Sequence, residues 1–146
     1  MPFVGWALNK WKNMRLADLI KPMEGVKVAV VHEVYEEVPG WFMYIINEKE
    51  VAITGILIQS YGKGEADAWP VKTSTLRHRM DRLEARSFKR IEMIIEEVFF
   101  LENTYWVSFY EGEQIYDKQF VFPPDSISLK NCIDIPLVEL PGVLAI

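Results

Sequence analysis

The feature that most constrains the fold of this chain is a pair of aromatic runs in its second half. Residues 104–110 and 115–122 are dense in aromatic and β-branched residues, and they flank a short polar break at Gly112. Apolar and polar side chains alternate in both runs, as they do in strands with one buried face. In the first run Tyr105, Val107 and Phe109 share one face, and the other face holds Thr104, Trp106, Ser108 and Tyr110. The pattern predicts a β-hairpin, which the rest of the chain must cover because such a hairpin is unstable alone.

Similar patterns extend along the rest of the chain. Further strands are predicted at residues 26–35, 41–47, 51–61, 71–76 and 88–95, with strand-like fragments at 133–137 and 143–146. Residues 62–70 contain two glycines and a proline and are predicted to form the longest loop, whereas residues 77–87 favour a helical turn or a polar loop. Short strands separated by frequent turns, without βαβ alternation, indicate an all-β fold. We expect an antiparallel immunoglobulin-like β-sandwich of about seven strands.

The first 21 residues differ from the remainder. Trp6 and Trp11 belong to a series of apolar residues spaced three or four apart among basic and amide side chains, and Pro22 follows. This spacing predicts a short amphipathic helix that ends before the proline. We therefore expect an N-terminal helical extension, residues 1–21, and a β-sandwich domain, residues 22–146. Such a helix would either pack on the sheet or bind a partner protein or a membrane surface.

The composition excludes several classes of protein. A chain of 146 residues with 50% hydrophobic residues fits one globular domain, and its net charge of −5 argues against a nucleic-acid surface over the whole chain. One cysteine, Cys132, cannot form an internal disulfide, and with two histidines it cannot build a zinc-type cluster. We expect no metal and no cofactor. The sequence lacks a transmembrane run and a signal-peptide pattern, so a cytoplasmic location is expected.

Basic residues are concentrated in one segment. Residues 72–90 hold seven of the 16 Lys and Arg side chains but two of the 21 Asp and Glu side chains. Arginine forks beside hydroxyl groups suit phosphate or carboxylate ligands. The candidate ligand-binding residues are Lys72, Thr75, Arg77, His78, Arg79, Arg82 and Arg90. The alternative is a solvated strand edge whose charges pair with nearby acidic residues and block aggregation.

No motif for catalysis is present. His78 has the side-chain chemistry of a general base, but it would need a carboxylate to orient it and a pocket for a substrate. The sequence lacks a GxSxG nucleophile elbow and a DxDxDG metal loop. We therefore assign no catalytic residue, and a small hydrolase that uses His78 is the least favoured hypothesis.

Four stretches of the chain carry a family resemblance. They are EGVKVAVVHE near residue 24, VKTSTLRH at 71–78, SF-x-x-IE at 87–92 and EEVFFLENTYWVSFYEGEQIYDKQFVF at 96–122. Together they resemble a small family of uncharacterised bacterial proteins, over roughly residues 24–146. The resemblance implies an immunoglobulin-like β-sandwich and little about activity. Some members are labelled phenylalanyl-tRNA synthetase subunit alpha, but this chain is far too short for a synthetase catalytic domain and lacks its ATP-binding motifs.

Two functional hypotheses follow from the sequence. The first is a non-enzymatic interaction module that binds a protein partner, or a second copy of itself, through a sheet edge or through the helix with Trp6 and Trp11. The second is a nucleic-acid or anionic-ligand binder that uses the basic segment 72–90. The sequence favours the first, because it is aromatic, rich in strands and poor in motifs for chemistry.

Overall fold

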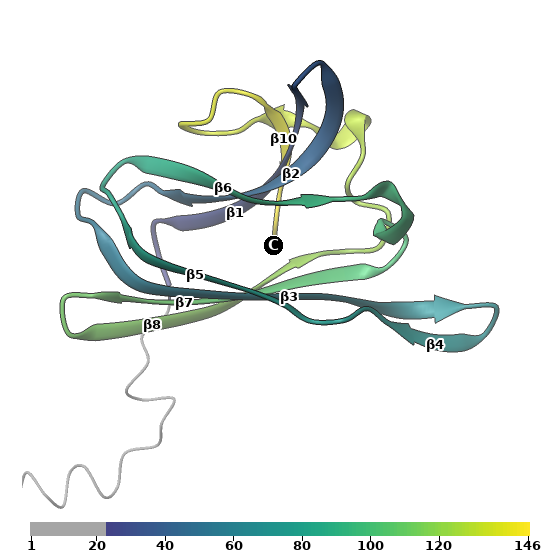
Figure 1. Ribbon diagram of the computed structural model, residues 1–146, viewed down its shortest axis with the longest axis horizontal. Coiled ribbons are helices and arrows are strands. Elements are labelled where there is room, and N and C mark those ends of the chain that lie inside the picture. The colour runs from purple at the N-terminus through teal and green to yellow at the C-terminus, as the bar shows by residue number, and fades with distance from the viewer. Residues whose placement is uncertain (1–22) are drawn as a thin grey trace, which may run out of the picture.

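The structure is a computed structural model that describes residues 23–146, and over this range it is an all-β antiparallel fold (Figure 1). The strands are β1 (Val26–Tyr35), β2 (Val38–Asn47), β3 (Ile53–Ala66), β4 (Trp69–Lys72), β5 (Leu76–Leu83), β6 (Ser87–Ile94), β7 (Glu102–Glu111), β8 (Gln114–Phe122), β9 (Ile133–Asp134) and β10 (Pro141–Leu144). Two 3-10 helices, η1 (Glu96–Val98) and η2 (Leu129–Asn131), complete it. The predicted antiparallel all-β class is confirmed. The count of about seven strands is wrong, because the described residues form ten. The helix predicted for residues 1–21 lies outside the described residues.

The strands form two sheets that lie one above the other (Figure 1). In sheet B the order is β6-β2-β1-β10-β9, and in sheet A it is β4-β3-β7-β8, with β5 also paired to β3. The chain crosses from sheet B to sheet A between β2 and β3, returns between β5 and β6, and crosses again between β6 and β7. Because β5 lies at the edge of one sheet and β6 at the edge of the other, these two strands frame the same side of the sandwich.

The predicted hairpin at residues 104–122 is confirmed as β7 and β8. Tyr105, Val107 and Phe109 share one face, as the alternation predicts, and this face is the buried one, while Trp106 on the opposite face remains 40% exposed. The ring of Tyr116 on β8 stacks on that of Phe109, with 5.2 Å between centroids. The inner faces of both sheets share one apolar core, to which β1 and β2 contribute Val28, Val30, Trp41, Met43 and Ile45. This core is what stabilises the aromatic hairpin.

The longest strand, β3, extends past the sandwich. Its first part pairs with β5 and its last residues pair with β4, so that the end of β3 and β4 form a two-stranded arm that projects from the body (Figure 1). The predicted loop at residues 62–70 is therefore wrong: the turn is shorter and lies at Asp67 and Ala68, which adopt left-handed φ angles of 51° and 66°. Gly64 belongs to the strand, where it allows close approach of Leu101, since a Cβ there would lie 2.9 Å from Leu101 Cδ2.

Residues 77–87 form most of β5 and the turn after it, so the prediction of a helical turn or polar loop is wrong. His78 and Met80 face inward, opposite Ile58 and Ile56 of β3, while the arginines between and before them face outward. The alternation of a strand is present in these residues. It was hidden in the sequence because the buried residues Met80 and Leu83 are three positions apart, a spacing that also suits a helical turn.

A second, smaller core lies on the outer face of sheet B. There the segment 135–140 folds back over β1 and β2, and its Ile135 and Val138 are buried against Val31, Phe42 and Ile46. In Figure 1 this segment is the yellow-green strip beyond β1 and β2. β10 comes very close to β1, because a Cβ on Gly142 would lie 2.7 Å from the backbone oxygen of Val30. Sheet B is thus covered on both faces.

Candidate functional site

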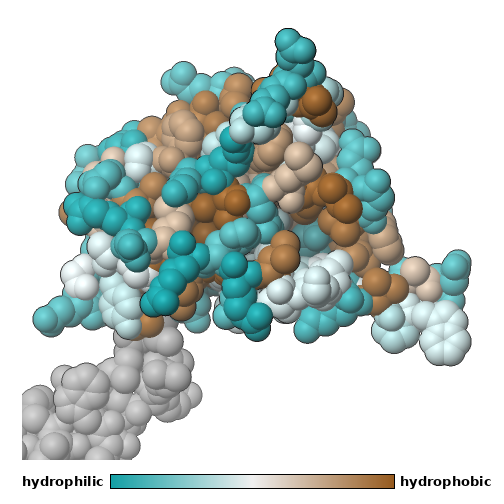
Figure 2. Space-filling model, in the orientation of Figure 1, coloured by the Kyte–Doolittle hydropathy of each residue, from teal (hydrophilic) through white to brown (hydrophobic). Residues whose placement is uncertain are grey.

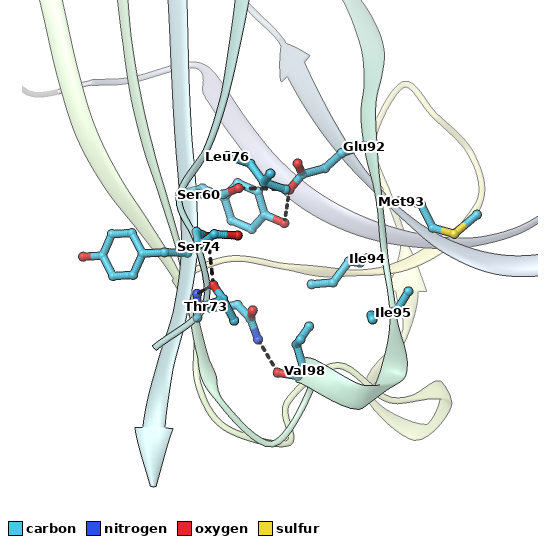
Figure 3. A pocket seen from close by; sticks show the side chains of 13 residues that line it. Ser60, Thr73, Ser74, Leu76, Glu92, Met93, Ile94, Ile95 and Val98 are labelled. Atoms are coloured by element: carbon cyan, nitrogen blue, oxygen red, sulfur yellow. Dashed lines mark hydrogen bonds between the residues drawn. The ribbon is translucent and has the colours of Figure 1, made fainter. Parts of the chain in front are cut away.

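A pocket of about 340 Å³ opens where β5 and β6 diverge (Figure 3). One wall consists of β3 and the link between β4 and β5, including Ser60 and Thr73. The other wall is the end of β6 and the start of η1, from Glu92 to Val98. Thr73 closes the end of its wall, since its Oγ1 accepts a 2.8 Å hydrogen bond from the N–H of Gly62. The size lies within the range of small-ligand pockets, at the open side of the sandwich.

The floor of the pocket is organised by one carboxylate. Glu92 reaches from β6 toward sheet A, as Figure 3 shows, and its side chain is 10% exposed. Its Oε1 accepts hydrogen bonds from the Ser60 hydroxyl at 3.2 Å and from the Tyr105 hydroxyl at 2.9 Å. Its Oε2 lies 2.7 Å from Nε2 of His78 on β5. A single glutamate on sheet B therefore binds three strands of sheet A: β3, β5 and β7.

The electrostatics of this cluster favour a neutral tyrosine. Burial raises the pKa of Tyr105 well above its usual value, and the charge of Glu92 and its hydrogen bond to the hydroxyl raise the pKa further. Tyr105 consequently stays protonated and continues to donate to the carboxylate. With the hydrogen bonds from Ser60 and the contact with His78, the buried carboxylate is fully surrounded by polar partners, as a buried charge requires.

The cluster supplies the carboxylate that His78 needs, but its order is not that of a nucleophilic triad. In a Ser-His-acid triad the imidazole lies between the serine and the acid and takes the serine proton. Here Glu92 lies between Ser60 and His78, and the serine hydroxyl donates to the carboxylate. The arrangement joins the two sheets and shapes the pocket floor, and it does not activate Ser60 as a nucleophile.

The rim of the pocket is apolar and exposed. Leu76 and Ile95 are 51% and 53% exposed beside the polar floor, whereas the side chain of Met93, 58% exposed, points away from the pocket (Figure 3). In the space-filling view, hydrophobic patches (brown) interrupt the hydrophilic surface on the side of the molecule where β5 and β6 lie (Figure 2). Within residues 23–146, β6 pairs with β2 along one edge, and its other edge pairs with no strand. The pocket thus lies beside an unpaired strand edge.

The basic segment is divided among several surfaces. Arg77 and Arg79 are exposed on β5, opposite Gln59 and Leu57, and face outward from sheet A. Lys72 lies near them, with its Nζ 4.7 Å from the centroid of the Tyr61 ring. These three basic residues are brought together along one edge of sheet A. His78, between the two arginines in sequence, faces inward to Glu92.

The remaining candidates lie elsewhere. Arg82 lies further along β5, opposite Thr54, where it pairs with Glu84 at 2.5 Å, and this pairing lowers the pKa of the Glu84 carboxyl. Arg90 belongs to sheet B, where its guanidinium stacks 4.1 Å from the centroid of the Tyr35 ring. Thr75 is half-buried in the link between β4 and β5. The seven candidate residues therefore do not share one site. Trp6 and Trp11, the candidate partner-binding residues, lie outside the described residues.

Sequence reasoning missed Glu92, Tyr105 and Ser60 as members of the pocket. Each stands alone in the sequence, without a motif around it, and they meet because three strands of two sheets converge. One signal was available: His78 alternates with outward-facing arginines, which marks it as an inward polar residue that needs a partner. The partner is Glu92, on the next strand of the chain.

No protein-family model matches the chain, and no curated protein matches it. Among residues 23–146 no helix is long and apolar enough to cross a membrane. The same residues contain no group of three or more His, Cys, Asp or Glu side chains placed to hold a metal ion. Function must be inferred from the pocket and the surfaces around it.

Proposed function

We propose that the protein is a non-enzymatic interaction module that binds an extended segment of a partner protein along the free edge of β6. Its fold is assigned to the immunoglobulin-like class. Two features of the strand order support this assignment: β1, β2 and β6 are neighbours in sheet B, and β3, β7 and β8 are neighbours in sheet A. These correspond to strands A, B and E and to strands C, F and G of an immunoglobulin domain.

The observation that carries the proposal is the unpaired edge of β6 beside the pocket. An exposed strand edge offers a row of backbone donors and acceptors to an incoming strand, and proteins that bind peptides by strand addition use such edges. Four consecutive residues of β6 and its continuation, from Glu92 to Ile95, line the pocket. A segment that pairs with this part of β6 would therefore lie directly over the opening.

Side-chain alternation gives the pocket a role in specificity. Along β6, Glu92 and Ile94 face the inside of the sandwich, while Met93 between them faces outward beside Phe42. A strand added to β6 alternates in the same way, so every second side chain would point toward the pocket. The exposed rim at Leu76 and Ile95 favours an apolar side chain there, and the fixed floor at Glu92 limits how deep it enters.

The proposal extends to partner and location. The partner is a second protein or a second copy of this chain, and the segment with Trp6 and Trp11 is a further contact surface of the module. We place the module in the cytoplasm, which the single cysteine of the sequence favours. Cys132 is half-buried, and burial raises the pKa of its thiol, so it is not a reactive thiolate.

The test is selection of peptides from a random display library on the folded protein, followed by affinity measurement with wild-type and variant proteins. Leu76→Asp and Ile95→Asp place a charge on the rim, and each is expected to weaken binding of the selected peptides about tenfold or more. Val34→Asp is the matched control, because Val34 is 67% exposed on β1, away from the pocket. Equal affinity for the rim variants and the wild type would refute the β6 edge as the binding site.

The alternative function, binding of nucleic acid or an anionic ligand by residues 72–90, needs a different surface. Arg90 lies on sheet B, and Arg82 lies further along β5, where it pairs with Glu84, so the basic residues grouped beside Trp106 are Lys72, Arg77 and Arg79. These three residues are too few for a general polyanion site, but they lie close to the exposed side chain of Trp106.

A further inference from the structure

The outer face of sheet A carries a hollow of about 470 Å³. Its lining residues are Leu57, Gln59, Trp106, Ser108, Ile115 and Asp117. The hollow exists because Ser108 is small and stands on β7 between two large side chains that face the same way, Trp106 and Tyr110. Trp106 and Tyr110 are 40% and 43% exposed, so an aromatic face remains open to solvent at the end of the hollow.

The strand register arranges charges across this hollow. One row across the sheet reads Arg77, Gln59, Trp106 and Gln119, and the next row reads Arg79, Leu57, Ser108 and Asp117. The β5 side is thus bordered by two exposed guanidinium groups, and the β8 side by a carboxylate. Amide groups of Gln59 and Gln119 flank the indole of Trp106. Lys72, held over the ring of Tyr61, continues the cationic side toward β4.

We infer that this face binds single-stranded nucleic acid, with a base in the hollow stacked on Trp106 and the adjoining phosphates at Arg77 and Arg79. Three features of a nucleotide match three features of the surface. A flat ring suits the open indole, an anionic backbone suits the arginine pair, and the N–H donors of a base suit the carboxylate of Asp117. A phosphate alone would not explain an acidic group on the far side of the hollow.

Single-stranded nucleic acid fits better than a duplex. Bases are accessible for stacking when they are unpaired, and a flat sheet face with aromatic side chains is a common platform for them. The cationic residues form a line along one edge and not a broad patch, which suits one backbone. Since the chain as a whole carries a net charge of −5, contact with nucleic acid is restricted to this edge.

The experiment is fluorescence anisotropy of labelled single-stranded RNA and DNA oligonucleotides of mixed sequence, titrated with the protein at several salt concentrations. Trp106→Ala is expected to weaken binding about tenfold or more, as loss of one stacked base does, and Trp106→Phe is expected to weaken it less because a ring remains. The double variant Arg77→Ala/Arg79→Ala is expected to reduce the slope of log K against log salt by about 1.4, through loss of two phosphate contacts.

Matched controls lie on other surfaces. Trp69→Ala removes an indole that is 75% exposed on the arm, and Arg90→Ala removes a guanidinium of sheet B that stacks on the Tyr35 ring; both variants are expected to bind oligonucleotides as the wild type does. The rim variant Leu76→Asp, which disrupts the proposed peptide site, is expected to leave oligonucleotide affinity unchanged. Circular dichroism of Trp106→Ala and Trp106→Phe establishes that both are folded before their affinities are compared.

Three results would overturn the inference. The first is absence of binding to either oligonucleotide at low salt. The second is binding that Trp106→Ala leaves unchanged, which would reduce the face to a surface for any polyanion. The third is competition by free mononucleotides as effective as competition by unlabelled oligonucleotide, which would mean a nucleotide pocket instead of a surface for a strand.

Discussion

The two outer faces of the sandwich contrast in how they meet solvent. On sheet B, the segment 135–140 returns across β1 and β2 and buries a second apolar core against them. On sheet A no such segment lies over β3 and β7 within residues 23–146, and Leu57 and Trp106 stay 44% and 40% exposed. The outer face of sheet B is therefore buried, whereas the outer face of sheet A remains exposed and available to a ligand.

The difference follows from what the strands place on their outer sides. β2 presents Phe42, Tyr44 and Ile46 outward, and an apolar row of this kind must be covered by another layer. β3 and β7 alternate apolar with polar residues on the outer face, and Gln59 and Ser108 tolerate water. A strand that is apolar on both faces therefore indicates a covering segment elsewhere in the chain, and a mixed outer row indicates an open face.

The largest effect is expected at Ile135, which belongs to the segment that covers sheet B and is 1% exposed. Ile135→Ala is expected to lower the free energy of unfolding by about 2–5 kcal/mol, because it removes buried methyl groups and leaves a cavity against Phe42 and Ile46. Urea denaturation followed by circular dichroism measures the change. A loss below about 1 kcal/mol would mean that the segment is not an integral layer of the fold.

A smaller effect on stability is expected at Tyr44, which also lies on the covered outer face of sheet B. Its hydroxyl donates a 2.5 Å hydrogen bond to Glu33 Oε1, and Tyr44→Phe is expected to cost about 1 kcal/mol at neutral pH. Burial, together with the hydrogen bond to Glu33 and its charge, raises the pKa of Tyr44 from 10.0 to about 12.

This raised pKa determines how the contribution of Tyr44 to the free energy of unfolding depends on pH. Because the folded state holds the proton more tightly, the stabilisation is complete below pH 10 and is lost as the pH rises from about 10 to about 12. The difference in unfolding free energy between wild type and Tyr44→Phe should therefore shrink over that interval. A difference that stays constant to pH 12 would contradict the assigned pKa.

The smallest effect is expected on the open face. Leu57→Ala is expected to change the free energy of unfolding by less than about 1 kcal/mol, because the side chain is 44% exposed at the hollow and few of its contacts are lost. Compared with Ile135→Ala under the same conditions, it measures the contrast between the faces directly. Similar losses for the two variants would show that sheet A is also covered in solution, for instance by self-association.

Much of the fold was predictable because alternation is strong where a strand has one apolar face. β1 and the β7–β8 hairpin were placed from such runs, while most of β2 was placed from a run that is apolar on both faces and β6 by analogy with the neighbouring strands. The arm was missed because glycines usually mark turns, whereas Gly64 permits close packing on Leu101. β5 was missed because its buried residues Met80 and Leu83 are three positions apart and because the inward His78 depends on a partner from another strand.

The candidate sites were less predictable than the fold. The basic segment 72–90 looked like one surface, but alternation sends Arg77 and His78 to opposite faces, and the β5–β6 turn carries Arg90 to the other sheet. Glu92 gave no signal as a lone glutamate in an apolar run. A local charge count locates basic residues in the sequence, but strand register and sheet exchange determine which of them share a surface.

The projecting arm has a consequence for motion. Along the last three residues of β3, the pairing with β4 joins just two strands, with Trp69 75% exposed beside the turn. A ribbon without a second layer has little buried surface, so its hydrogen bonds should open by local fluctuation far more often than those of β1 or β7. Amide hydrogens of residues 63–72 should consequently exchange with solvent long before the sandwich unfolds, and the arm can bend against a bound surface without disturbing the core.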